Sequence, residues 1–548
     1  MDLRSQVSGL IKGDAQDDAP TRKLYSRDTS IFERTPAVVV FPKDSEDVAR
    51  LVQFAHDEKA EGKNVSITAR SAGSDMTGGP LTDSVSVVFT RYMNRLLEIG
   101  KDYAVVEPGM YYRDFEKKTL ASGGLILPSF PASREICALG GMLANNSGGE
   151  LTLKYGKTNS YIKEMDVVLS DGSRTVLYPL TMRELAQKES QKTLEGKIYR
   201  DVHVLIENNK EAIEQARPSV TKNSAGYALW NVMDKEKGTF DLAQLVCGSQ
   251  GTLALITSAR VKLVRTKENR AMLVIFLSDL DIIPEVVHRV LKFSPESFES
   301  YDDKTWKLAV RFIPQIIGQF GLFKMIALGF AFIPDIFLAL SGAVPKLVLM
   351  AEFAENTKEE ARERVREAQS ALEGLHVRSK IASSNAHTAK YWTVRRESFA
   401  LLRKNLHGLH AAPFIDDIVV HPDDYPKFLP ELNKLLGEYN LLYTIAGHAG
   451  EGNFHIIPLM DLGKEENRKI ILELQPRVYK LVAKYHGSIT GEHNDGIIRT
   501  PYLPIMFGEE MCKLFAQVKN IFDPLNVLNP GKKVGGTIAD IERSILKR

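Results

Sequence analysis

The chain has 548 residues, of which 44% are hydrophobic and 26% are charged. This length predicts two or three packed units rather than a single core. The 71 Lys and Arg residues nearly balance the 69 Asp and Glu residues, which gives a net charge of +2. Composition therefore provides no global field that would recruit nucleic acid, and we expect no nucleic-acid partner.

Cysteine usage and the N-terminus indicate a reducing compartment. Cys137, Cys247 and Cys512 lie far apart and form no CxxC pair, which argues against a disulfide framework or a thiolate metal centre. The first residues, MDLRSQVSGLIKGDAQDDAP, carry acids and lack the apolar run of a signal peptide. We therefore expect a cytoplasmic protein.

The N-terminal half begins with a β-α-β pattern. The run AVVVFP predicts a strand over 37–42, and residues 44–58 carry apolar side chains at helical spacing. A strand in NVSITA then breaks into a glycine-rich loop, and strands are predicted in SVSVVF and YAVV. An Asp-Gly turn between two β-rich runs predicts a hairpin over 167–179.

From about Ala271 the pattern changes to strands that alternate with long helices. The strand-like segments are AMLVIFLSD, PKLVLMAEFAE, FIDDIVVHP and LLYTIAGH, and TKEEARERVREAQSALEG is helical. This pattern predicts a second domain, built on an antiparallel sheet with helices on one side. The last helical stretch stops at Pro524.

Residues 311–346 are unusually apolar, with only Lys324 and Asp335 as charges in the interior. Their charge-free runs are 12, 10 and 10 residues long, whereas a spanning helix needs roughly 20 apolar residues. Two alternatives remain open for this segment. It is either a buried or dimer-forming helical insertion, or a patch that docks on a membrane surface.

Three small-residue loops predict a cofactor cradle. RSAGSDMTGG (70–79) follows a strand, and its backbone N–H groups can point at an anion, although it is neither a Walker A nor a GxGxxG motif. PSFPASREICALGGMLANNSGG (128–149) and CGSQGTLALIT (247–257) add further glycines. Together the loops suggest a long ligand wrapped by backbone.

The motif GHAGEGNFH (447–455) places two histidines seven residues apart with glycines between them. The glycines at 450 and 452 let the chain reverse, so that His448 and His455 could converge on one ion. Two histidines leave a divalent site short of ligands, and we expect an acid as the third. GEHNDG offers Glu492 beside His493, so one of the pair could face a metal and the other a substrate.

These loops, with KYGKTNSYIKEMDVVLSDG, resemble in order and spacing the PCMH-type flavin domain of the vanillyl-alcohol oxidase superfamily. GHAGEGNFH, GSITGEHNDG and IFDPLNVLNPGK resemble the C-terminal domain of its FAD-linked oxidases, the branch of D-2-hydroxyacid dehydrogenases. The resemblance, from about Tyr25 to Lys532, implies an α+β fold. We expect a two-lobed FAD-binding domain over 1–265, a cap or substrate domain over 266–475, and a C-terminal segment over 476–548 whose helices return to the FAD domain.

The resemblance also assigns residues to noncovalently bound FAD, since no His or Cys stands in the first loop. The pyrophosphate would be held by Ser71, Ala72, Gly73, Ser74 and Asp75. The ribityl chain and isoalloxazine would be lined by Pro131, Ser133, Ala144, Asn146 and Ser147. The adenine side would be reached by Gly251 and Ile256, and the flavin would also be touched by Asn529.

For the chemistry, the resemblance implies zinc or manganese on His448, His455 and Glu492, with His493 as base. A Trp-x-x-Arg motif points to Arg395 as the carboxylate ligand. The metal would acidify the hydroxyl of a 2-hydroxy acid, and hydride would pass to FAD N5. The expected substrate is D-lactate, with D-2-hydroxyglutarate or glycolate as alternatives. A non-redox flavoenzyme like the alkylglycerone-phosphate synthases and a catalytically silent scaffold are the competing hypotheses.

The chain departs from the family pattern at three positions. Asn494 replaces the usual Gly after the base, Gln250 replaces Glu in the third loop, and His421 replaces a Pro. Relatives with similar motifs often carry an iron–sulfur domain, but this chain has three cysteines. We therefore expect quinone or an electron-transfer protein as acceptor, and either a peripheral place on the cytoplasmic face of the membrane through 311–346 or a homodimer.

Overall fold

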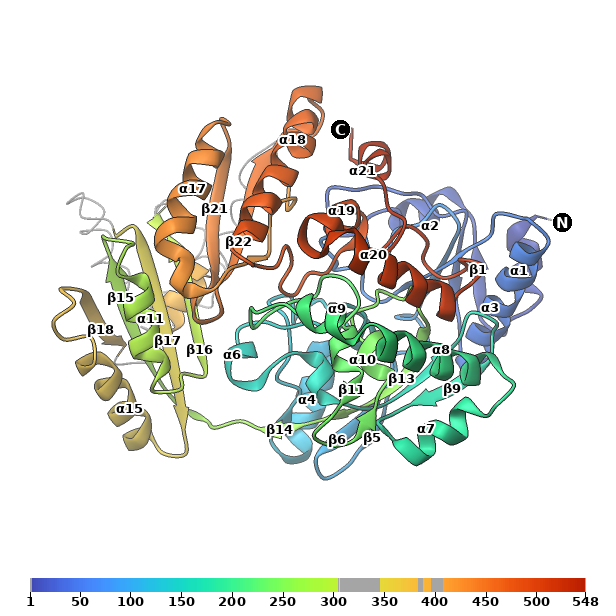
Figure 1. The fold of residues 1–548 in the computed structure, drawn as a ribbon, viewed down its shortest axis with the longest axis horizontal. Helices are drawn as coiled ribbons and strands as arrows, with labels where there is room; N and C mark the ends of the chain where they lie inside the picture. Colours follow the sequence, from blue (N-terminus) through green and yellow to red (C-terminus); the bar gives the residue numbers. More distant parts are fainter. Residues whose placement is uncertain (1, 304, 306–344, 383–387, 396–407, 548) are drawn as a thin grey trace.

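The computed structural model describes residues 2–303, 305, 345–382, 388–395 and 408–547. The apolar segment at 311–346 lies outside these residues except at its last two positions, so both alternatives for it stay predictions. Among the described residues, no helix combines the length and the apolarity needed to span a bilayer. The fold is α+β, as predicted, and Figure 1 shows the sheet of the predicted cap on the left and the N-terminal sheets on the right.

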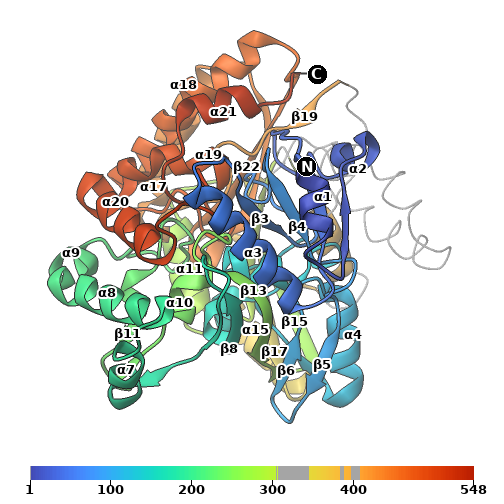
Figure 2. The ribbon, with the colours of Figure 1, turned by 90° about the vertical axis from the view of Figure 1, so that its right-hand side faces the viewer.

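The first sheet contains the predicted β-α-β unit. Its strands lie in the order β1-β2-β4-β3, with β2, β4 and β3 parallel. The crossover helix α3 starts after Asp44, whose carboxylate accepts a hydrogen bond from the Asp47 N–H, and it contacts β3 (Figure 2). The elements are β1 (Asp14–Gln16), β2 (Val38–Phe41), α3 (Ser45–Ala60), β3 (Ile67–Arg70) and β4 (Val85–Val88).

The second sheet is antiparallel in the order β5-β6-β13-β8-β9. Its β8–β9 hairpin turns at Gly172, which has a φ of +84°, as the Asp-Gly signal predicted. Helix α3 contacts β8 and β13, and α4 contacts β5. The elements are β5 (Leu96–Ile99), β6 (Tyr103–Val106), α4 (Tyr112–Gly123), α5 (Leu139–Asn145), β8 (Ile162–Val168), β9 (Arg174–Leu177), α8 (Leu194–Asn208) and β13 (Leu255–Lys262).

The cap is built on a larger antiparallel sheet in the order β18-β15-β17-β16-β21-β22-β19, with β20 also on β22. Helix α11 contacts both α15 and α17, and α15 packs on β15 and β17. The bounds are β15 (Asn269–Leu277), α11 (Ile283–Leu291), β16 (Ser297–Asp302), β17 (Leu347–Glu355), α15 (Lys358–Ser370), β18 (Arg378–Ala382), β19 (His410–Ala411), β20 (Ile418–Val419), α17 (Tyr425–Gly437), β21 (Leu442–His448) and β22 (Asn453–Met460).

The C-terminal helices return to the FAD-binding part, as predicted. Helix α20 packs against both α8 and α18, and Phe515 on α20 meets the Tyr227 ring edge-on at 5.9 Å. A bridge between Phe32 and Ile545 joins the two ends of the chain. The helices are α18 (Glu465–Lys484), α19 (Gly496–Arg499), α20 (Leu503–Phe522), which ends before Pro524 as predicted, and α21 (Ile538–Ser544).

Candidate functional site

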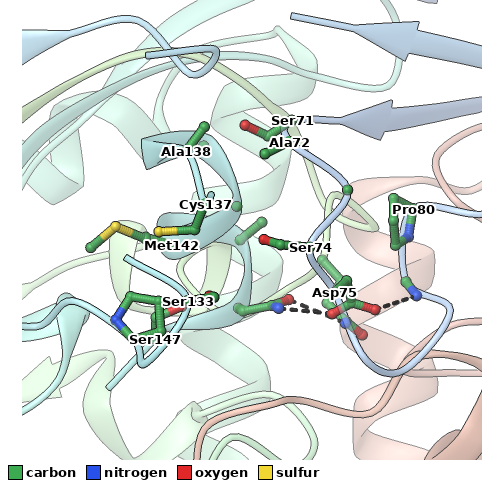
Figure 3. Close-up of a pocket in the computed structure, with 18 of the residues that line it drawn as sticks. Ser71, Ala72, Ser74, Asp75, Pro80, Ser133, Cys137, Ala138, Met142 and Ser147 are labelled. Atoms are coloured by element: carbon green, nitrogen blue, oxygen red, sulfur yellow. Dashed lines mark hydrogen bonds between the residues drawn. The ribbon is translucent and has the colours of Figure 1, made fainter. Parts of the chain in front are cut away.

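A cavity of about 310 Å³ opens where the three glycine-rich loops meet. Figure 3 shows the first loop on one side of it and the second loop, with Ser133, Cys137 and Ala138, on the other. All but two of the predicted FAD contacts line this cavity. The predicted contacts that line the cavity are Ser71, Ala72, Gly73, Ser74, Asp75, Pro131, Ser133, Ala144, Ser147, Gly251 and Ile256.

The first loop presents backbone rather than charge. Among the described residues, the N–H groups of residues 72–76 donate to no protein acceptor, so they are free for an anion. The Asp75 carboxylate faces its own loop, where it accepts hydrogen bonds from the Thr77 and Gly79 N–H groups and from Asn145. Asp75 therefore holds the shape of the loop, and its backbone rather than its side chain suits a pyrophosphate.

Helix α5 lines the opposite wall with glycine. A Cβ built on Gly141 would meet only the Ser71 Cβ, at 3.8 Å, so it would project into the open cavity. A larger side chain here would occupy the space between the loops. The free N–H groups on one wall and this missing side chain on the other fit a flat, elongated cofactor such as FAD.

Asn146 and Asn529 do not line the cavity, which differs from the prediction for these two residues. Asn146 ends α5 in a left-handed conformation and accepts from the Asn159 N–H. The buried Asn529 amide donates to the Gly79 and Gln250 carbonyl oxygens. Their side chains are used to hold cofactor loops in place rather than to face the cavity.

Two departures from the family pattern have a structural account. Asn494 has a φ of +73°, a conformation that Gly adopts freely and Asn tolerates, and its amide donates to the Asn145 and Gly248 carbonyl oxygens. Gln250 accepts from the Gly496 N–H and donates to Thr77. The third, His421, is exposed and pairs with Asp423, away from the predicted ligands.

The β21–β22 hairpin brings the two predicted metal ligands together. Ala446 pairs with His455, so His448, two residues further along β21, shares a sheet face with His455. The ring centroids lie 5.3 Å apart. Gly452 permits the tight reversal with a φ of +74°, and a Cβ there would lie 1.7 Å from the Val420 oxygen.

Glu492 completes a converging donor set. Its Oε1 lies 3.3 Å from His448 Nε2 and 3.4 Å from His455 Nε2. The buried Lys222 ammonium contacts the other oxygen at 3.3 Å and also Glu451 at 3.0 Å. Burial would raise the pKa of Glu492, but Lys222 and His448 outweigh it and hold that pKa well below its usual range. Two imidazole nitrogens and an ionised carboxylate fit zinc or manganese.

Asp416 joins this donor set to His493. Its Oδ1 accepts from His455 Nδ1 at 3.1 Å, and its Oδ2 lies 2.8 Å from His493 Nδ1. Burial alone would lower the pKa of His455, but Asp416 and then Glu492 raise it to about 10. The rings of His455 and His493 are stacked with centroids 5.1 Å apart, and His493 lines the cofactor cavity with Glu492.

Asp417 belongs to a second possible donor group with His455, Glu492 and His493. Its Oδ2 already accepts from the Glu492 N–H, the His493 N–H and Thr490, and its Oδ1 accepts from Asn453. A carboxylate used in this way organises the loop that carries Glu492 and His493. His448, whose Nε2 faces Glu492, is the better ligand.

Arg395 lies beside the metal donors but pairs with Glu299 at 3.1 Å. The same Glu299 accepts from His448 Nδ1 at 2.5 Å. Burial would raise the pKa of Glu299, but His448 and Arg395 lower it to about 2. Sequence reasoning missed Glu299, Asp416, Asp417 and Lys222, and for the aspartates the adjacent pair in FIDDIVV was the available signal.

Two family models match the chain. One is described as "FAD binding domain" and covers residues 36–177, and the other is described as "FAD linked oxidases, C-terminal domain" and covers residues 266–533. Similar folds occur in 4-ethylphenol oxidase from Gulosibacter chungangensis (15% identity, TM-score 0.68, 98% of this chain and 97% of that one) and in an alkyldihydroxyacetonephosphate synthase (16%, 0.62, 96% and 85%). The two family models together assign the chain to the FAD-linked oxidases.

Its relatives fall in the branch predicted from the motifs. A D-2-hydroxyglutarate dehydrogenase of Pseudomonas putida is 27% identical over 95% of this chain, which spans about half (50%) of that relative's length. A glycolate oxidase subunit of Bacillus subtilis is 26% identical and covers 96% of this chain and 95% of its own. A D-lactate dehydrogenase of Archaeoglobus fulgidus is 26% identical, with 91% of each chain covered.

Proposed function

We propose that the protein is an FAD-dependent dehydrogenase that oxidises a D-2-hydroxy acid, with D-lactate as the preferred substrate, to the 2-oxo acid. The observation that carries this proposal is the shared cavity wall: Glu492 and His493 line the same cavity as the cofactor loops. A substrate held at the metal donors would then lie next to the flavin. D-2-hydroxyglutarate and glycolate are the alternative substrates.

His448, His455 and Glu492 would hold the zinc or manganese ion. When bound, FAD would supply the two-electron acceptor, and the metal would supply a Lewis acid that acidifies the substrate hydroxyl. His493, with Nδ1 directed at Asp416, takes the hydroxyl proton at Nε2. Arg395 exchanges part of its contact with Glu299 for the substrate carboxylate, which its planar guanidinium can bind through two hydrogen bonds.

The wider assignments rest on this site. We propose the division of the chain into a FAD-binding domain (1–265), a cap (266–475) and a C-terminal segment (476–548). Quinone or an electron-transfer protein is the proposed acceptor. The proposed location is the cytoplasm. There the protein either forms a homodimer or contacts the membrane through residues 311–346.

Anaerobic mixing of the FAD-loaded protein with D-lactate, D-2-hydroxyglutarate and glycolate tests the proposal. We expect loss of the oxidised-flavin absorbance with the D-isomer of the true substrate and not with its L-isomer. A flavin that every 2-hydroxy acid leaves oxidised, while dithionite reduces it, would refute the dehydrogenase assignment. The rank of reduction rates among the three acids decides the substrate.

A further inference from the structure

Asp416 is placed between two imidazoles that have different duties in the proposed reaction. It is completely buried, and each of its carboxylate oxygens lies near the Nδ1 atom of a different histidine. Oδ1 is hydrogen-bonded to His455 at 3.1 Å, and Oδ2 lies 2.8 Å from His493 Nδ1 as an ion-pair contact. The two rings are stacked at an interplanar angle of 24°. Asp416 therefore constrains both rings to similar orientations.

The position of Asp416 is itself fixed from its backbone. The buried Arg499 donates to the Asp416 carbonyl oxygen at 2.7 Å and to the Asn494 and Ile489 carbonyl oxygens. One guanidinium thus ties the segment before β20, which carries Asp416, to the loop that carries His493. The carboxylate has little freedom to follow one ring at the expense of the other.

A carboxylate has only acceptors, so each Nδ1 that faces it must carry a proton. Both neutral rings are then the tautomer whose Nε2 is a free lone pair. On His455 this atom faces Glu492 at 3.4 Å, where a metal would need it. On His493 the Nε2 lone pair remains available to a substrate in the cavity, as a base requires.

We propose that Asp416 is a shared positioning residue, which sets the tautomer and orientation of the metal ligand His455 and of the base His493 at the same time. This inference rests on the proposed function for the role of His493. Metal binding and proton abstraction are then coupled through one side chain, although Asp416 touches neither metal nor substrate.

Replacement by Asn separates this role from simple packing. Asp416→Asn keeps the volume but offers one acceptor and one NH₂ donor, so at least one Nδ1 loses its acceptor and that ring must move its proton to Nε2. Asp416→Ala removes both acceptors. We expect Asp416→Ala to weaken Zn²⁺ binding about 10–100-fold and to slow flavin reduction. We expect Asp416→Asn to lower either the Zn²⁺ affinity or the rate of flavin reduction, or both.

The measurements are Zn²⁺ affinity by chelator competition on the metal-stripped, FAD-loaded protein, and flavin reduction by the best 2-hydroxy acid across pH. Asp241→Asn is the matched control, since Asp241 is also buried but accepts from the Ala243 N–H and Gln244 far from the metal donors. Equal flavin content and melting temperature in all variants excludes loss of fold.

Wild-type Zn²⁺ affinity in Asp416→Ala, or wild-type values of both quantities in Asp416→Asn, would overturn the inference. The Zn²⁺ titration needs no substrate. If no 2-hydroxy acid reduces the wild-type flavin, the proposed function fails, while a 10-fold loss of Zn²⁺ affinity in Asp416→Ala still supports the control of His455.

Discussion

His448 and His455 lie on one face of a hairpin, and each is oriented by a buried carboxylate that also contacts a second residue of the site. Glu299 links His448 to Arg395, and Asp416 links His455 to His493. Ligands that are held in this way lose little freedom when a metal binds. Glu299 and Asp416 therefore also position the predicted substrate-facing groups, Arg395 and His493, beside the predicted metal ligands.

At the residue scale, His493→Ala should slow flavin reduction by about 10²–10⁴-fold, the usual contribution of a general base. Flavin and metal should be retained, because neither the cofactor loops nor His448, His455 and Glu492 lose an atom. Stopped-flow reduction measures the effect. His421→Ala is the control, since His421 is exposed, and an undiminished rate in His493→Ala would show that another group is the base.

Lys532 gives a pH prediction. Its buried ammonium donates to the Leu81 carbonyl oxygen at 2.7 Å, and burial, with Arg34 nearby, lowers its pKa from 10.5 to about 7. Between these values the unfolded chain binds the proton more strongly than the folded chain, so stability rises with pH from about 7 to 10. The contribution is on the order of a few kcal/mol over the window.

Lys532→Met should flatten that part of the pH profile. From pH 7 to 10 the melting temperature of the wild type should rise relative to that of the variant, because only the wild type carries a buried group that loses its charge in this window. Lys480→Met, at an exposed position of α18, should run parallel to the wild type. Parallel curves for Lys532→Met would mean that Lys532 is not the titrating group.

From the sequence alone it was possible to predict that residues inside two local motifs would lie close together. His448, His455, Glu492 and His493 stand in two short glycine-containing segments, and the structure brings these four together. Glu299 could not be found in this way. It lies in the mostly polar segment SFESYD, which suggests exposure to solvent, yet all of β16 is buried.

At the element scale, β21 and β22 act as one unit whose turn sets the histidine separation. The strands β2 and β15 were found because each contains an apolar run, which is buried throughout β2 and over residues 271–275 of β15. The order of the cap sheet could not be predicted, because β16 lies between β17 and β21 through contacts that no local pattern encodes. That order is what brings Glu299 to His448.

The turn itself can be tested with Gly452→Ala. The substitution adds a left-handed strain of about 1–2 kcal/mol and also a Cβ that would lie 1.7 Å from the Val420 oxygen, so the hairpin must shift. We expect a lower melting temperature and reduced metal content. Gly62→Ala isolates the strain, because Gly62 has a φ of +83° with nothing near its Cβ. Equal losses in the two variants would mean that the hairpin tolerates the clash.

At the scale of the whole molecule, the cofactor cavity is lined by residues from both N-terminal sheets and from the predicted cap. Its lining runs from Thr29 and the first loop through α5 and Gly251 to Ala411 and His493, so it joins both FAD-binding sheets to the cap. A ligand that fills it contacts every part of the fold. Cofactor binding should therefore stabilise the chain as a unit.

FAD added to flavin-stripped protein should raise the melting temperature in a concentration-dependent way, because binding adds about 2.7 kcal/mol to the free energy of unfolding at 100 times the dissociation constant. Gly141→Val should remove most of this response, since its side chain would project between the loops. Differential scanning calorimetry with and without FAD measures both. A full response in Gly141→Val would place the cofactor elsewhere.

The Asn529 amide has a consequence for how the protein is made. It holds the carbonyl oxygens of Gly79 and Gln250, which lie 450 and 279 residues earlier in the chain. Translation must therefore reach Asn529 before these two carbonyl oxygens can take their final positions. We therefore expect FAD to bind only after Asn529 has been synthesised and has joined the first and third loops.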